Sequence, residues 1–296
     1  MKKRITVYTP TYNRAYCLDN LYQSLLRQTN KSFQWLVIDD GSTDNTQKLV
    51  NNWIANNKLP IIYKCQINKG KQEAVNLAHY LIDTELNVCV DSDDYLTDSA
   101  IEIILSKWDE LEQEDVAGIV GLDSFQDRRI VGTKFPANLK YARFCDFKDI
   151  HKIKGDKKFV YKTEIIKKYP PYPSISNERF PAPGYLYRLI DQDYKLALIN
   201  EVLCIVTYLP DGISSNKFEQ FKKCPNAFVF YRLERMRMAV NYKDKFKNAI
   251  HYINSSIFAK KAIFSGNKYK LTTLLALPFG YVLYFYIKYS NKKGVI

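Results

Sequence analysis

The first 125 residues alternate between short β-type runs and amphipathic helical patterns. Four runs rich in β-branched and aromatic residues predict strands, at residues 4–9 (RITVYT), 33–39 (FQWLVID), 61–67 (IIYKCQI) and 86–90 (LNVCV). Apolar residues after each run recur three or four positions apart, as at Leu18, Leu21, Tyr22, Leu25 and Leu26. Strands separated by helices are typical of a parallel sheet. We therefore expect an α/β fold with an open, mostly parallel, Rossmann-like sheet and helices on both faces.

The remaining sequence divides into an irregular stretch and a helical one. Residues 126–214 contain the loop-rich YPPYPSISNERFPAPG, the helical pattern YLYRLIDQDY and then LALINEVLCIVTYL, which predicts one or two strands. From Phe218 onward an aromatic helical pattern predominates. We expect a catalytic domain at 1–214, with halves at 1–125 and 126–214, followed by a C-terminal helical segment at 215–296.

One part of this C-terminal segment is strongly apolar. Residues 271–287 (LTTLLALPFGYVLYFYI) include no charged side chain, but Pro278 and Gly280 interrupt the run. A helix that spans a bilayer needs about 20 apolar residues. The pattern therefore favours an interfacial or re-entrant element over a transmembrane span or a core helix.

Composition and charge narrow the picture. With 46% hydrophobic and 25% charged residues, the chain is unlike a disordered protein. Residues 1–214 carry 28 basic and 28 acidic side chains, whereas residues 215–296 carry 16 and 3, so the whole net charge of +13 belongs to the C-terminal segment. Such a basic segment indicates an anionic partner, either a lipid surface or nucleic acid.

Cysteine and histidine usage excludes the common zinc sites. The six cysteines are far apart without a CxxC pair, and the chain has three histidines. The start MKKRITVYTP continues as a strand pattern and shows no signal peptide. We expect buried thiols in a reducing cytoplasm.

Polar loops follow each of the first four predicted strands: PTYNR, DDGSTD, NKGK and DSDD. In an open α/β sheet these loops gather at one edge, where ligands bind. The last loop places Asp91, Asp93 and Asp94 within four residues, and such carboxylates repel one another unless a cation or hydrogen-bond donor compensates. Mg²⁺ or Mn²⁺ suits oxygen ligands of this kind, and the alternative is an acidic turn that caps the next helix.

The other loops add groups that suit a nucleotide. Tyr12 offers an aromatic face to a base, and Asp39 or Asp40 can accept a hydrogen bond from a base N–H. Lys69 and Lys71 offer cations to phosphates. Together the loops predict a nucleotide diphosphate site.

The order VYTPTYNR, VIDDGSTD, NKGKQEAVN and VDSDDYLTD resembles the inverting family 2 glycosyltransferases of the glycosyltransferase-A fold, in particular bacterial capsule and exopolysaccharide enzymes. The resemblance covers about the first 100 residues and implies a UDP-sugar donor. It implies that Thr9, Pro10 and Tyr12 line the uracil pocket. Asp39 then accepts from the uracil ring, and Lys71 lies near the base and diphosphate.

The resemblance also separates the three carboxylates of DSDD. It implies that Asp91 lies by the ribose and that Asp93 binds the Mn²⁺ or Mg²⁺ ion that bridges the diphosphate. Asp94 is left to shape the turn.

The catalytic base is where this sequence departs from the family pattern. Many relatives carry a Glu-Asp or Pro-Glu pair at the start of the helix that YLYRLI would match, but the position expected for the acid is Pro183 here. The nearest carboxylate, Glu178, is the expected base, with Asp191, Asp193 and Asp211 as alternatives.

We therefore expect a metal-dependent inverting glycosyltransferase of polysaccharide synthesis. It would move a sugar from a UDP-sugar to a hydroxyl of a lipid-linked saccharide acceptor, with the basic segment on the inner leaflet of the cell membrane. The alternatives are a soluble, homo-oligomeric glycosyltransferase with a non-lipid acceptor, and a nucleotidyltransferase. Nucleic acid is not an expected partner, because the acidic sheet edge repels phosphate.

Overall fold

The computed structural model describes residues 2–111, 115–175, 178–179, 182, 184–207 and 217–290. These residues belong to two compact units. The first unit comprises Met1–Tyr172 and Leu186–Tyr208, and the second comprises Pro173–Tyr185 and Leu209–Ile296. The second unit thus includes a segment from the middle of the chain as well as the C-terminal part.

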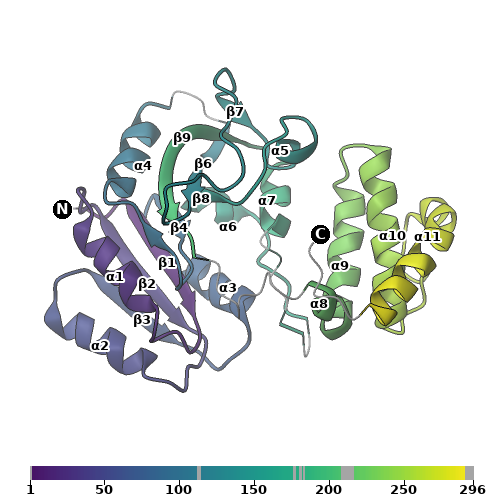
Figure 1. Cartoon of the computed structure of the whole chain (residues 1–296), viewed down its shortest axis with the longest axis horizontal. Helices are drawn as coiled ribbons and strands as arrows, with labels where there is room; N and C mark the ends of the chain where they lie inside the picture. Colours follow the sequence, from purple (N-terminus) through teal and green to yellow (C-terminus); the bar gives the residue numbers. More distant parts are fainter. Residues whose placement is uncertain are drawn as a thin grey trace. The chain divides into compact units, whose positions relative to one another are not determined.

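A mixed sheet of nine strands forms the centre of the first unit in the described part of the chain (Figure 1). The strand order is β3-β2-β1-β4-β8-β6-β9-β5, and β7 pairs with β9. The strands are β1 (Ile5–Thr11), β2 (Phe33–Asp39), β3 (Ile61–Cys65), β4 (Leu86–Cys89), β5 (Tyr95–Leu96), β6 (Val116–Ser124), β7 (Tyr141–Ala142), β8 (Lys157–Lys162) and β9 (Lys195–Ile205).

The sheet is parallel where the sequence predicts it. The first four strands, β1 to β4, all run in one direction, and β6 runs parallel to β9. The antiparallel strand β8 lies between β4 and β6. The expected open, mostly parallel α/β sheet is confirmed, with the first four strands ending at one edge.

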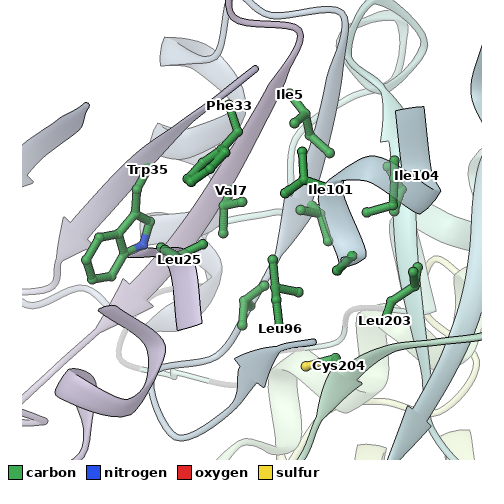
Figure 2. Packing of buried hydrophobic residues seen from close by; sticks show 14 of the residues in the cluster. Ile5, Val7, Leu25, Phe33, Trp35, Leu96, Ile101, Ile104, Leu203 and Cys204 are labelled. Carbon is green, nitrogen blue, oxygen red and sulfur yellow. The ribbon is translucent and has the colours of Figure 1, made fainter. Parts of the chain in front are cut away.

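Helices cover both faces of this sheet. The helices of the first unit are α1 (Leu18–Arg27), α2 (Thr46–Asn56), α3 (Lys71–Leu81), α4 (Ala100–Asp109), α5 (Asp146–Asp149) and α6 (Thr163–Lys168). The boundary between the two units falls within α7 (Gly184–Ile190). Figure 2 shows Ile5 and Val7 of β1 in one core with residues of α1 and α4. Successive strand residues point to opposite faces, so Tyr8 lies on the other face, where its hydroxyl is 3.0 Å from Nε2 of His79 in α3.

The second unit contains four helices among the residues described: α8 (Lys217–Lys223), α9 (Pro225–Arg237), α10 (Tyr242–Phe258) and α11 (Lys270–Tyr289). Its core joins Val229 and Met236 of α9 to Tyr252 and Ile253 of α10 and to Ala276 of α11. The expected C-terminal helical segment is therefore confirmed.

Helix α11 corrects one expectation, because Pro278 does not interrupt it. The helix continues from Lys270 to Tyr289, with Pro278 inside it. A proline removes one helical hydrogen bond, and packing against α10 nearby, where Gly280 meets Ile253, holds the helix together. Among the described helices, α11 has the length and the apolar composition needed to cross a membrane. Of its apolar stretch, 28% is buried.

Candidate active site

Four loops leave the sheet at the edge where β1 to β4 end. The last residues of these strands are Thr11, Asp39, Cys65 and Cys89. In the register of the sheet, Thr11 lies opposite Asp39, and Asp39 lies opposite Cys65. The four polar loops of the sequence therefore start side by side.

The first two loops are tied together by one asparagine. Asn13 has a left-handed backbone (φ 52°), and its Oδ1 accepts hydrogen bonds from the N–H groups of Thr43 at 2.7 Å and Asp44 at 3.3 Å. The backbone N–H of Asn13 in turn donates to Ser42 Oγ at 2.9 Å. The neighbouring Tyr12 stays 45% exposed, so its ring is accessible beside this rigid junction.

The other two residues of the expected uracil pocket are buried in β1. The hydroxyl of Thr9 accepts a hydrogen bond from Trp35 Nε1 at 3.0 Å, so this side chain faces the core. Pro10 is buried as well. Beyond them, the buried Thr11 Oγ1 has no hydrogen-bond partner among the described residues, which leaves a polar group for a ligand or water at this edge.

Asp39 is held by the protein on both of its carboxylate oxygens. Oδ1 accepts from the N–H of Ser42 at 2.7 Å, and Oδ2 accepts from the Tyr63 hydroxyl at 2.6 Å. Burial and this hydrogen bond raise the pKa of Tyr63, so its hydroxyl stays protonated. Asp39 thus orders the DDGSTD loop, and a base N–H would have to share an oxygen that is already in use.

Asp40 connects the second loop to the third. Its Oδ1 accepts from Gln66 Nε2 at 2.7 Å and from the N–H of Lys69 at 2.8 Å, and Oδ2 accepts from the N–H of Gly70 at 2.7 Å. Gly70 has φ 99°, which favours glycine, and precedes the first residue of α3. Asp40 therefore places the beginning of α3 at the ligand edge.

The first residue of α3 forms an ion pair with the DSDD loop. Lys71 Nζ lies 2.7 Å from Asp91 Oδ2, and both side chains are partly exposed. Burial favours the neutral carboxyl, but the nearby Lys71 outweighs it and lowers the pKa of Asp91. The NKGK and DSDD loops are thus joined by a fixed pair of opposite charges.

Asp93 lies half-buried beside this pair. Burial and the charge of Asp91 raise its pKa, and Arg14 and Lys71 partly oppose the rise. The described residues include no cluster of three or more side chains that could hold a metal ion by themselves. Mg²⁺ is commonly held by one or two carboxylates together with the phosphates of the substrate, and Asp91 and Asp93 fit this arrangement.

Asp94 contacts the protein interior. Its Oδ1 accepts from the N–H of Thr207 at 3.1 Å, and its Oδ2 lies 3.9 Å from Nζ of the buried Lys158. Burial raises the pKa of Asp94 to about 7, although Lys158 acts in the opposite direction.

Sequence reasoning did not identify Lys158 or the buried Asp123 of β6 as parts of this region. Both residues contribute to the electrostatics of Asp91 and its neighbours. Charged residues within the strand-like runs KKFVYK and VGLDS were the only signal for them.

Glu178, the expected base, belongs to the second unit. One carboxylate oxygen accepts from the N–H and Nδ2 of Asn226, at 3.0 and 2.7 Å, and the other accepts from the N–H of Ala227 at 2.6 Å. This carboxylate therefore caps the N-terminus of α9, where a negative charge is favourable. A base role for Glu178 stays a prediction.

The alternatives for the base have their own contacts. Asp191 is buried and accepts from the N–H groups of Phe144 and Cys145, at 2.9 and 2.7 Å. Asp193 accepts from the Tyr169 hydroxyl at 2.6 Å. Two positions relevant to the base, Pro183 and Asp211, lie outside the described residues.

A comparison with protein families decides the class of enzyme. The model described as Glycosyl transferase family 2 matches residues 6–169, which is more than half of the chain and includes all four loops. The chain belongs to glycosyltransferase family 2. The nucleotidyltransferase alternative is therefore set aside.

Curated relatives match less than half of this family 2 chain. Glycosyltransferase GlyG of Streptococcus pneumoniae serotype 4 is 28% identical over 123 residues, covering 41% of this chain and 39% of GlyG. The chondroitin synthase of Escherichia coli is 32% identical over 104 residues, covering 35% of this chain and 15% of the synthase. The chain thus spans less than half the length of these curated relatives.

Solved structures share the fold over most of the chain. Staphylococcus aureus TarS 1–349 has a TM-score of 0.62 at 20% identity, covering 94% of this chain and 80% of that one. The mannosyltransferase PcManGT of Pyrobaculum calidifontis, in complex with GDP-Man and Mn²⁺, has a TM-score of 0.57 at 16% identity, covering 97% and 88%. At such identities the likeness shows the fold, which is of the glycosyltransferase-A type.

Proposed function

We propose that this family 2 glycosyltransferase transfers a sugar, with inversion, from a UDP-sugar to a hydroxyl of a saccharide acceptor in cell-surface polysaccharide synthesis. The observation that carries the proposal is the ion pair of Lys71 and Asp91 beside Asp93, at the edge where four polar loops meet. TarS, which shares the fold, has been solved with UDP-GlcNAc, which supports a UDP-linked donor.

In this proposal the loops divide the work of binding the nucleotide. The exposed ring of Tyr12 stacks on the base, and Asp39 or Asp40 accepts from the base N–H. Asp91 lies by the ribose, held in place by Lys71, whose ammonium also favours the diphosphate. Since Asn13 ties the backbone next to Tyr12 to the second loop, these two loops lose little conformational entropy when the base binds.

Asp93, with Asp91 beside it, would hold a divalent ion, Mn²⁺ or Mg²⁺. Such an ion acts as a Lewis acid that stabilises the negative charge of the departing UDP. Lys71 adds a fixed positive charge near the same phosphates.

Glu178 is proposed as the base that removes the proton of the acceptor hydroxyl. Such a hydroxyl has a pKa far above 7, so a positioned carboxylate is needed for in-line displacement. Glu178→Gln keeps one oxygen acceptor but sets an NH2 group against an N–H at the beginning of α9, so a melting curve of the variant accompanies the assay. We expect turnover to be lost while UDP binding persists; retained turnover would move the role to Asp211.

The donor is tested without knowledge of the acceptor. Full-length protein is incubated with single UDP-sugars and Mn²⁺, and release of UDP is measured. We expect slow hydrolysis of one UDP-sugar, abolished by EDTA and by Asp93→Asn. If neither UDP nor a UDP-sugar binds in the presence of Mn²⁺, the proposal fails.

We further propose that the enzyme works at the cytoplasmic face of the cell membrane on a lipid-linked acceptor. Helix α11 exposes a stripe of large apolar side chains: Leu271, Leu274, Leu275, Phe279, Val282, Phe285, Tyr286 and Tyr289. Residues 215–296 carry 16 basic and 3 acidic side chains. Near an anionic leaflet each basic residue contributes about 1 kcal/mol, and an apolar stripe adds insertion.

Flotation with vesicles tests this attachment. Leu275→Asp together with Val282→Asp should abolish flotation with phosphatidylglycerol vesicles, because both side chains are exposed and apolar. Tyr80→Asp, at an 80% exposed aromatic position of α3, is the matched control and should still float. If the double variant floats like the wild type, membrane attachment through α11 is wrong.

The stripe on α11 also suits the second candidate, a soluble homo-oligomer with a non-lipid acceptor. Mass measurement without detergent separates the two. A defined oligomer that dissociates in the same double variant, with no flotation of the wild type, would favour this candidate.

A further inference from the structure

A lysine lies buried beneath the DSDD turn. Lys158 of β8 is 8% exposed, and its Nζ is 3.9 Å from Asp94 Oδ2 and 3.5 Å from the carbonyl oxygen of Cys89. Burying an ammonium is costly unless negative groups compensate it. The position of this lysine therefore calls for an explanation.

The strands around Lys158 bring several chain segments to it. In the sheet, β8 lies between β4, which leads to the DSDD turn, and β6, which ends at the buried Asp123. Asp94 also accepts from the N–H of Thr207, just after β9. The ammonium thus lies close to where the turn attaches to the chain just after β9.

The charges around Lys158 stabilise its ammonium group. Burial acts against the ammonium, but the acidic groups around it outweigh burial and raise the pKa of Lys158 well above its ordinary value. They include the carboxyl groups of Asp123, Asp94 and Asp91. Asp123 is 2% exposed, and its Oδ1 has no hydrogen-bond partner among the described residues; burial raises its pKa, and the nearby Lys158 opposes this rise.

We propose that Lys158 is a positioning residue of the donor site, which holds Asp94 against the interior of the sheet and so leaves Asp93 as the carboxylate for the metal. The inference rests on the proposed function, since it assigns a role at the same site. It explains how three carboxylates can lie together in residues 1–214, which carry no net charge. Lys71 compensates Asp91 at one side of the turn, and Lys158 compensates Asp94 at the other.

Binding of Mn²⁺-UDP to the full-length chain, followed by calorimetry, tests the role. Lys158→Met removes the charge with little change in volume. We expect the affinity for Mn²⁺-UDP to fall about tenfold or more, as for residues that orient metal ligands. Lys158→Arg retains the charge and should recover part of the loss.

The adjacent Lys157 provides a matched control. It is 7% exposed, and its Nζ donates to the carbonyl oxygens of Val131 and Lys154, at 2.9 and 2.7 Å. Lys157→Met should therefore lower the melting temperature without changing the affinity of the folded protein for Mn²⁺-UDP. An equal loss of affinity in the two Met variants, or none in Lys158→Met, would overturn the proposal.

A double-mutant cycle gives a second, donor-independent measurement. Asp94→Asn and Lys158→Met should be strongly non-additive in thermal unfolding, because each removes the other's partner. Additive effects in a protein that still binds Mn²⁺-UDP would contradict this inference alone. A wild type that binds no Mn²⁺-UDP, with the coupling intact, would instead contradict the proposed function.

Discussion

Lys71 and Asp91, 20 residues apart in the chain, meet at 2.7 Å and join two ligand loops. Because both side chains are partly exposed, the pair contributes little to folding, about 0.2–1 kcal/mol. Its position suggests a larger role in binding. We expect Lys71→Met to leave the melting temperature nearly unchanged and to weaken UDP binding about tenfold, about 1.4 kcal/mol.

Isothermal titration of UDP with Mn²⁺ measures this effect. Lys69→Met is the control, because Lys69 contacts Asp40 through its backbone N–H, which the substitution keeps. Equal weakening in both variants would show that general positive charge, and not the pair with Asp91, matters.

The three carboxylates of DSDD should behave differently when each is replaced. Asp93→Ala should abolish metal-dependent turnover, since it removes the carboxylate proposed for the metal. Asp91→Ala should weaken donor binding by leaving Lys71 without its partner. Asp94→Asn should cost least in turnover, and assays over a range of Mn²⁺ concentrations check the order. A larger effect at Asp94 than at Asp93 would reverse the assignment.

The packing of α11 on α10 depends on Gly280. A Cβ added there would lie 2.6 Å from Cβ and Cγ2 of Ile253. We expect Gly280→Ala to lower the free energy of unfolding by about 1–3 kcal/mol, through overpacking. Val282→Ala, on the exposed face, should change it by less than about 0.5 kcal/mol.

Urea denaturation measures both variants. In the background of Ile253→Gly, which removes Cβ together with Cγ2, the cost of Gly280→Ala should largely disappear because the clashing atoms are gone. A cost that persists there would place the strain elsewhere in the helix.

Two half-buried histidines should make the protein sensitive to acid. Burial lowers the pKa of His79 to about 4 and that of His251 to about 3, against an ordinary value of 6.5. Below pH 6.5 the unfolded chain binds protons that the folded chain does not, so stability falls as the pH is lowered. At pH 5 each histidine should cost up to about 2 kcal/mol relative to pH 7.5.

Urea midpoints at the two pH values check this sensitivity. Replacing both histidines by Gln should flatten the dependence between pH 7.5 and 5. An unchanged slope in the double variant would assign the acid sensitivity to carboxylates.

Much of the first unit could be predicted from the sequence, because its local patterns agree with its tertiary structure. The alternating runs gave β1 to β4 and their helices, and the polar loops after them do lie at one edge. The position of β8 was not foreseeable. Its sequence KKFVYK begins with two lysines, and only long-range pairing with β4 and β6 buries Lys157 and Lys158.

The same limit applies to Glu178 and Pro278. Glu178 accepts a hydrogen bond from Asn226, 48 positions away, and no local sequence pattern predicts such a contact. Pro278 is a local helix breaker, yet the packing of Gly280 on Ile253 holds α11 together around it. In both cases contacts between distant segments decided the structure.

The assignment of residues 173–185 to the second unit bears on how this enzyme could be recombined with its relatives. The chain passes between the units three times, and Glu178 is bonded to the beginning of α9. If only the C-terminal helices were exchanged for those of another transferase, the Glu178 carboxylate would lose its hydrogen-bond partners in α9. A functional chimera would have to carry 173–185 and 209–296 together, so these two segments should be exchanged as one module.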